Sequence, residues 1–219
     1  MSARHLRLLL RVAALAALVV AAGLVVASDT LHARLAEGVA WGEALIARAP
    51  VAGMAAFVVL SALSAVFAFF SSSLLSPVAI AAWGLPGTFG LLWLGWLLGG
   101  AVTYATGRFI GRSAAGLFVD EATLAVWESR IGSRANVSRV LLFQVAMPSE
   151  VLGYVLGLLR YPFRIYIAVL AVTEIPYALA VVYLGESFLA GNAAAFMLIG
   201  AAVVATTAAL YALVRRRLA

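Results

Sequence analysis

Three glutamates and four arginines could carry chemistry in a chain that is 65% hydrophobic and only 11% charged. Glu150 and Glu174 lie within long apolar stretches, whereas Glu186 is expected to be a solvated loop charge. An ionised carboxylate inside hydrocarbon costs about 2.5–3.5 kcal/mol on insertion scales, and such residues often carry protons in transporters. We therefore predict that Glu150 and Glu174 are proton-linked transport residues. The alternative is that each pairs with an arginine or caps a broken helix.

Arginine supplies all fifteen basic side chains, and the net charge is +6. A soluble domain has about 25% charged residues, so the composition indicates an integral membrane protein. In such a chain, arginines hold topology and touch anionic lipid headgroups, and no nucleic-acid partner is expected. Arg108, Arg139, Arg160 and Arg164 could bind a phosphate headgroup or pair with the glutamates. Topology anchoring alone is the other interpretation.

The usual signatures of an enzyme are missing from the sequence. There is no cysteine, and His5 and His32 lie at opposite ends of the first apolar segment, so they cannot share a metal ion. The chain has no glycine-rich phosphate loop with a lysine and no set of nucleophile and base. We expect no catalytic residues, no metal and no cofactor.

The stretch from Val140 to Arg164 combines an apolar composition with Pro148, Glu150 and two glycines. Arginines flank it at both ends, and the positive-inside rule places both ends in the cytoplasm. About 20 residues can span a membrane once but not twice, because a helix rises 1.5 Å per residue. The stretch is therefore predicted to be a re-entrant hairpin that lines a polar cavity, with Gln144 as its other strong polar group.

Residues 49–107 contain no charged residue, and the loop that follows is rich in arginine. The chain enters this run on the outer side of the membrane and leaves it on the cytoplasmic side. That change of side fits a re-entrant hairpin over 51–84 followed by a span over 87–107. The break is indicated by Ser76-Pro77 and by Gly84-Leu85-Pro86-Gly87. In the span, small residues recur every fourth position and predict close helix packing: Gly95, Gly99, Thr103 and Gly107.

The remaining segments complete an all-α membrane fold. Residues 1–28 are predicted to form an N-terminal transmembrane helix, with a cleavable signal peptide as the alternative. Residues 29–50 read as an outer interfacial helix with Leu31, Leu35, Trp41 and Leu45 on one face. The loop 108–139 is expected to hold another interfacial helix after Asp120. A span over 165–185 is interrupted by Glu174 and Pro176, and residues 191–219 form a last span, 193–214, before a cytoplasmic arginine tail.

The two halves follow one design with opposite orientation, a hairpin and then a span. Inverted repeats with broken helices that meet near the midplane are the architecture of many secondary transporters. We therefore expect residues 51–190 to form one membrane domain, in a multi-pass protein whose two termini are cytoplasmic.

The stretch from Pro77 to Arg112 contains Tyr104, Gly107 and Arg108 near its end, and the stretch PSEVLGYVLGLLRYPFR has Pro148, Tyr154 and Gly157. A third stretch, EIPYALAVVYLG, has Pro176, Tyr183 and Gly185. In these three stretches the domain resembles the DedA superfamily, whose domain is also called the VTT or SNARE-associated Golgi protein domain. The resemblance implies two inverted re-entrant hairpins and a role in membrane homeostasis, through proton-dependent transport or through movement of undecaprenyl phosphate or phospholipid.

The chain departs from the family pattern at two places. No acid lies between Glu43 and Asp120, and Leu142, Phe143 and Gln144 occupy the region where many members have an arginine. Proton coupling would therefore have to use Glu150 or Glu174. We expect a translocase for lipids or lipid phosphates in the bacterial inner membrane, with membrane lipids as partners and a homo-oligomer left open. The alternatives are a proton-coupled transporter of small solutes or ions and a membrane scaffold that transports nothing.

Overall fold

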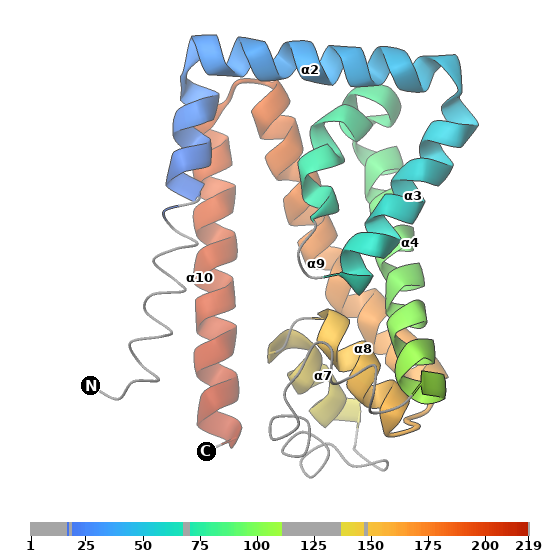
Figure 1. The fold of residues 1–219 in the computed structure, drawn as a ribbon. Helices are drawn as coiled ribbons and strands as arrows, with labels where there is room; N and C mark the ends of the chain where they lie inside the picture. Colours follow the sequence, from blue (N-terminus) through green and yellow to red (C-terminus); the bar gives the residue numbers. More distant parts are fainter. Residues whose placement is uncertain (1–16, 18, 68–70, 111–136, 147–148, 219) are drawn as a thin grey trace. The chain divides into compact units, whose positions relative to one another are not determined.

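The computed structural model describes residues 17, 19–67, 71–110, 137–146 and 149–218 (Figure 1). Within these ranges the chain is helical and contains no strand, which confirms the predicted all-α class. A helix over Val19–Ala27 comes first. It is followed by α2 (Asp29–Arg48), α3 (Pro50–Val66), the 3-10 helix η1 (Ser72–Leu75), α4 (Ser76–Ile110), α7 (Val137–Ala146), α8 (Ser149–Leu158), α9 (Phe163–Leu189) and α10 (Ala193–Leu218).

Among the described helices, two are long and apolar enough to cross a membrane, Ser72–Ile110 and Phe163–Leu189. A third span would result if Val19–Ala27 and His32–Arg48 were one broken helix, and these two segments are bent by 91°. A right-angle turn of this kind suits a helix that leaves the membrane and then lies along its surface.

A kink at Gly84 divides α4 into two segments. The φ of Gly84 is 68° and its ψ is 178°, a conformation that glycine adopts without the steric penalty of a Cβ atom. Pro86 follows within the first turn of the second segment, where a missing N–H costs no helical hydrogen bond. At 1.5 Å per residue, residues 85–110 extend about 39 Å, enough to cross a hydrocarbon core of about 30 Å.

The described residues fall into two compact units. One unit takes the described parts of Met1–Pro50, Ser73–Thr88 and Leu179–Ala219. In it, α2 packs on the first segment of α4 where Gly42 faces Val78, and the end of α9 packs on that same segment where Gly185 faces Ile80. The helix before α2 lies antiparallel to α10 (Figure 1), with Gly23 against Met197 and Gly200 against Val19.

The outer face of α2 keeps large apolar side chains exposed. Leu35, Trp41 and Leu45 are 48%, 71% and 52% exposed, while Val39 on the neighbouring face is buried. Asp29 in the first turn and Arg48 in the last turn match the helix dipole, which favours anions at the N-terminus and cations at the C-terminus. Such a helix, apolar on a side that no described part of the chain covers, is suited to the lipid surface.

The other unit, the described parts of Val51–Ser72 and Phe89–Ala178, surrounds the second segment of α4. Gly95 and Gly99 lie against α3, where added Cβ atoms would overlap with Ser61 and Ala62. On the α9 side, the Trp93 indole N–H donates to the Ala171 carbonyl over 2.9 Å. The small residues of this segment therefore let α3 approach the backbone of α4 closely.

In the same unit, α7 and α8 contact each other and have ten residues each. A ten-residue helix is about 15 Å long, roughly half of the hydrocarbon thickness. Over the residues that the structure describes, each helix is shorter than a membrane span. Pro148 lies outside the described residues.

The prediction that Glu174 and Pro176 interrupt the span over 165–185 is wrong. α9 is one continuous helix of 27 residues with Pro176 inside it. Proline removes one backbone donor, but a membrane helix tolerates this where neighbouring groups satisfy the freed carbonyl. α9 also extends to Leu189, so Glu186 is a half-buried residue of its last turn and not a loop charge.

Candidate functional site

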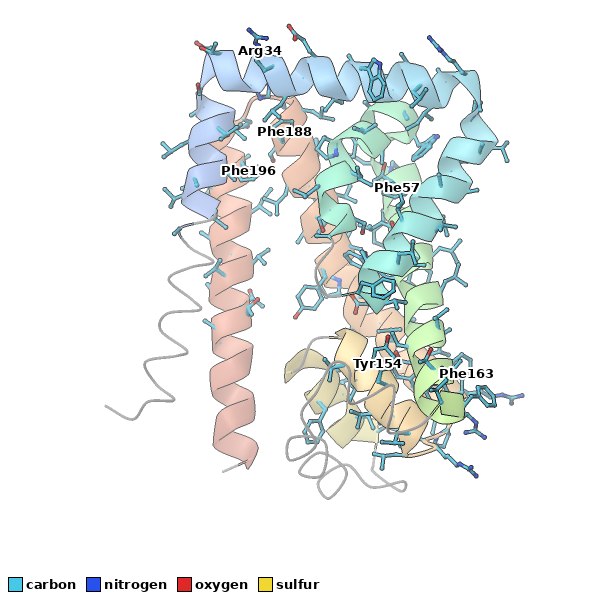
Figure 2. The ribbon with its side chains drawn as sticks, in the orientation of Figure 1. Arg34, Phe57, Tyr154, Phe163, Phe188 and Phe196 are labelled. Carbon is cyan, nitrogen blue, oxygen red and sulfur yellow. The ribbon has the colours of Figure 1, made fainter. Side chains whose placement is uncertain are left out.

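Two of the predicted phosphate-binding arginines line one open pocket of about 560 Å³ in the second unit. Arg108 comes from the last turn of α4, and Arg160 comes from the turn between α8 and α9. The other lining residues are small, apolar or aromatic: Ala101, Tyr104, Ala105, Phe109, Pro162 and Phe163. Figure 2 shows Phe163 beside the C-terminal end of α4. The pocket thus combines two cations with an apolar wall.

A tyrosine hydroxyl joins the two sides of this pocket. The Tyr104 O–H donates to the backbone carbonyl of Tyr161, the residue after Arg160. The same oxygen accepts an N–H from the Arg108 guanidinium over 3.2 Å. The Tyr104 ring is buried and stacks on Tyr166 with ring centroids 5.5 Å apart, so its position is fixed by packing.

Arg160 has a backbone conformation that is unusual for a side chain of its size. Its φ is 54°, in the left-handed region. Its N–H donates to the Gly157 carbonyl over 3.0 Å, and the Tyr161 N–H donates to the Leu156 carbonyl over 2.9 Å. This is the Schellman pattern that closes α8, and its left-handed position is usually taken by glycine. Because arginine costs free energy there, its presence points to a use for the side chain.

Among the described residues that line the pocket, none is acidic. Burial raises the pKa of the Tyr161 phenol above its ordinary value of 10.0, so that nearby group is neutral at physiological pH. Arg108 and Arg160 are both exposed, and they repel each other only weakly through solvent. An anion between them would be attracted by both guanidinium groups. Guanidinium matches the geometry of phosphate oxygens particularly well.

The pocket is held by a close crossing of α4 and α8. A Cβ atom on Gly107 would overlap with the Tyr154 carbonyl, and a Cβ atom on Gly157 would overlap with the Tyr104 carbonyl. The two helices use the same pattern reciprocally, a tyrosine followed three residues later by glycine. One turn earlier, Thr103 lies against Gly153. Two of the predicted packing residues, Thr103 and Gly107, therefore lie at the contact between α4 and α8, next to Arg108 in the sequence.

Tyr154 also contacts the end of α3, the first arm of the hairpin predicted over 51–84. Its hydroxyl donates a long hydrogen bond of 3.5 Å to the carbonyl of Val66, the last residue of α3 (Figure 2). Nearby, Ser64 donates to the Ser61 carbonyl over 2.8 Å, and its oxygen lies 2.9 Å from the Ser72 hydroxyl oxygen. The end of α3 therefore contacts α8 one helical turn after Glu150 in the sequence.

Two further candidates are buried polar residues of this unit. Glu174 on α9 is 8% exposed and Gln144 on α7 is 5% exposed. Within the described part of the chain, the Gln144 Oε1 atom has no hydrogen-bond partner. Both side chains are thus polar groups that are buried in this unit.

Among the predicted residues whose side chains the structure describes, the others are not part of the pocket lining. Arg164 is exposed in the first turn of α9, and Pro176 is exposed later in that helix. Pro77, Gly84 and Pro86 belong to the start and kink of α4. Arg139 and Glu150 are helical residues of α7 and α8, but their side chains lie outside the described residues. The helix expected after Asp120 also lies outside the described part of the chain.

Sequence reasoning did not assign the aromatic residues of the pocket to the site. Tyr104 stands four residues before Arg108, which places the two on one face of a helix. Tyr161 and Phe163 follow Arg160, in the turn before α9 and at the first residue of α9, and aromatic residues give little signal in a chain this apolar. The spacing of Tyr104 and Arg108 is the one pattern that could have identified the hydroxyl.

Comparison with known proteins gives one match. The family model of the VTT domain matches residues 13–187, which is most of the chain. No curated protein matches the chain, and no solved structure matches it. The matched range includes every described residue that lines the pocket.

Proposed function

Because this membrane protein belongs to the VTT domain family, we propose that it is a translocase that moves lipids or lipid phosphates across the bacterial inner membrane. The observation that carries the proposal is the pocket with Arg108 and Arg160. Its cations suit a phosphate, and its aromatic and proline walls suit the hydrocarbon next to that phosphate. A soluble anion would need the cations but not the apolar wall.

The path in this proposal is formed by two re-entrant hairpins in inverted orientation. The short helices α7 and α8 support the second hairpin, and the kink at Gly84 supports a first hairpin over 51–84. Broken helices in inverted repeats place binding sites near the midplane and allow alternating access. The crossing of α4 with α8 then belongs to the contact between the two repeats.

Glu174 and Glu150 are the proposed proton-linked residues. Glu174 is buried in α9, and a membrane acid of this kind is a candidate for proton uptake and release. In this proposal the arginines hold the headgroup, and the carboxylates couple its movement to the proton gradient.

The test measures headgroup translocation in phosphatidylcholine proteoliposomes that contain a trace of fluorescent phosphatidic acid, with dithionite as the quencher. The wild type should translocate the tagged lipid faster than empty vesicles. Arg108→Gln and Arg160→Gln should each slow translocation about tenfold, because charge-assisted hydrogen bonds contribute about 1.5–3 kcal/mol. Arg34→Gln, which changes an exposed arginine of α2, is the matched control and should have no effect.

The two glutamates are tested in the same vesicles with and without a proton gradient. Glu150→Gln and Glu174→Gln should abolish the response to an uncoupler. Rates equal to the wild type for both would remove these acids from the mechanism. No lipid movement by any variant or by the wild type would refute the translocase. Uncoupler-sensitive solute uptake would then indicate a small-solute transporter, and no uptake would indicate a scaffold.

A further inference from the structure

The Tyr104 hydroxyl makes two contacts that meet at the headgroup site. It donates to the Tyr161 carbonyl, in the turn that holds Arg160, and it accepts from the Arg108 guanidinium over 3.2 Å. The Tyr104 oxygen therefore links the turn that contains Arg160 to the side chain of Arg108 through two hydrogen bonds. These bonds connect α4 with the loop that follows α8.

This hydroxyl is oriented by its surroundings. The ring is 4% exposed and contacts both Tyr166, at 5.5 Å, and Phe163, at 5.1 Å between centroids. The O–H proton is used on the Tyr161 carbonyl, so the oxygen presents its lone pairs to Arg108. A hydroxyl that donates to a carbonyl is also a better acceptor, because hydrogen bonds in a chain polarise one another.

Arg108 has few other constraints, since it is exposed and lies in the last turn of α4. An arginine side chain loses substantial rotamer freedom when it binds a ligand, and fixing it beforehand lowers that cost. We propose that Tyr104 is a positioning residue for phosphate, which holds the Arg108 guanidinium toward the pocket shared with Arg160. This inference rests on the proposed function and adds a specific residue to its site.

The test titrates water-soluble dihexanoyl phosphatidic acid into the detergent-solubilised full chain by calorimetry. Tyr104→Phe keeps the ring and removes the hydroxyl. It should weaken binding about three- to tenfold, below the full value of a charged hydrogen bond because Arg108 is exposed. Tyr166→Phe is the matched control: it removes a hydroxyl from the same stack, one that donates to the Gly100 carbonyl, and it should leave the affinity unchanged.

A double variant separates positioning from a purely structural role. If Tyr104 acts through Arg108, then Tyr104→Phe combined with Arg108→Gln should bind as weakly as Arg108→Gln alone. A structural role would lower thermal stability and give additive losses. Additive losses, or wild-type affinity for Tyr104→Phe while Arg108→Gln is weakened, would overturn the proposal. If Arg108→Gln and Arg160→Gln both bound the lipid with wild-type affinity, the proposed headgroup site itself would be refuted.

Arg108→Lys provides a second variant that does not disturb the buried ring. Lysine keeps the positive charge but lacks the planar guanidinium group that Tyr104 orients. Binding of the lipid should therefore weaken about as much as is expected for Tyr104→Phe. Undiminished binding would show that charge alone matters and would overturn the proposal. Inorganic phosphate is titrated in parallel. Tighter binding of the short-chain lipid identifies the apolar wall as part of the site, and the dependence on Tyr104 should be the same for both ligands.

Discussion

Among single residues, Arg160 gives the clearest structural indication of a functional role. It occupies the left-handed position that closes α8, with φ of 54°. Glycine in its place should relieve strain and raise the stability of the protein by about 1 kcal/mol, offset in part by the freedom glycine gains in the unfolded state. The same substitution should slow lipid translocation, because it removes one of the two pocket cations. Thermal unfolding in detergent and the vesicle assay measure the two effects.

Gly191 serves as the control for this prediction, because it also has a positive φ but lies outside the pocket lining. It has φ of 61° in the turn between α9 and α10, and it is already glycine. Gly191→Ala should lower the melting temperature without changing translocation. If Arg160→Gly translocates lipid at the wild-type rate, the left-handed arginine has no role in transport and the pocket loses one of its two proposed ligands.

The charged residues of the candidate site could be selected from the sequence, but their arrangement in space could not. Arg108 and Arg160 stand out because charges are rare in this chain. Their grouping in one pocket depends on the crossing of α4 and α8, which joins residues 47 to 53 positions apart in the sequence. Arg164 is only four residues after Arg160, yet it is an exposed residue in the first turn of α9 and is not among the residues that line the pocket. Charge and hydropathy do not encode that difference.

At the scale of helices, the decisive contact is the glycine crossing between α4 and α8. Gly107→Ala should destabilise the protein by about 1–3 kcal/mol, because the new methyl group would overlap with the Tyr154 carbonyl of a packed helix. It should also displace Arg108, the next residue, and weaken phosphate binding. Thermal unfolding and short-chain lipid titration measure both outcomes.

Gly90 is the matched control on the same helix. A Cβ atom there has no neighbour within 4 Å, so Gly90→Ala should be neutral or slightly stabilising, since alanine is the better helix former. Equal effects of the two substitutions would show that the crossing is looser than the structure indicates and that it does not hold the pocket.

Helix breaks differed in how well they could be predicted. The break near Gly84-Leu85-Pro86-Gly87 is present as a kink at Gly84, where glycine supplies the positive φ and proline begins the next segment. Glu174 and Pro176 gave a similar sequence signal, but α9 continues through them. Proline alone has a fixed φ that a helix can accommodate, whereas a positive φ ends the helical path. The glycine, and not the proline, was the informative residue.

At the scale of the whole molecule, the membrane class and the all-helical fold follow from composition and length. The predicted orientation of the two halves depends on the number of arginines in the loops. The positive-inside rule behind it describes how a chain inserts into the membrane, not how its helices pack. The inverted repeat therefore requires a measurement of sidedness. The chain contains no cysteine, so single cysteines can be introduced without first removing native ones.

Three exposed positions test the second hairpin by labelling with a membrane-impermeant maleimide in intact cells and inverted vesicles. Ser138 lies in the first turn of α7, Arg164 lies in the first turn of α9 at the end of the predicted hairpin, and Asn192 lies in the turn after α9. If α7 and α8 enter and leave on one side, Ser138→Cys and Arg164→Cys should react from the cytoplasm and Asn192→Cys from outside. Labelling of Ser138→Cys and Arg164→Cys from opposite sides would mean that the pair crosses the membrane. The arginine pocket would then open on the opposite face from Ser138, and the repeats could not be inverted.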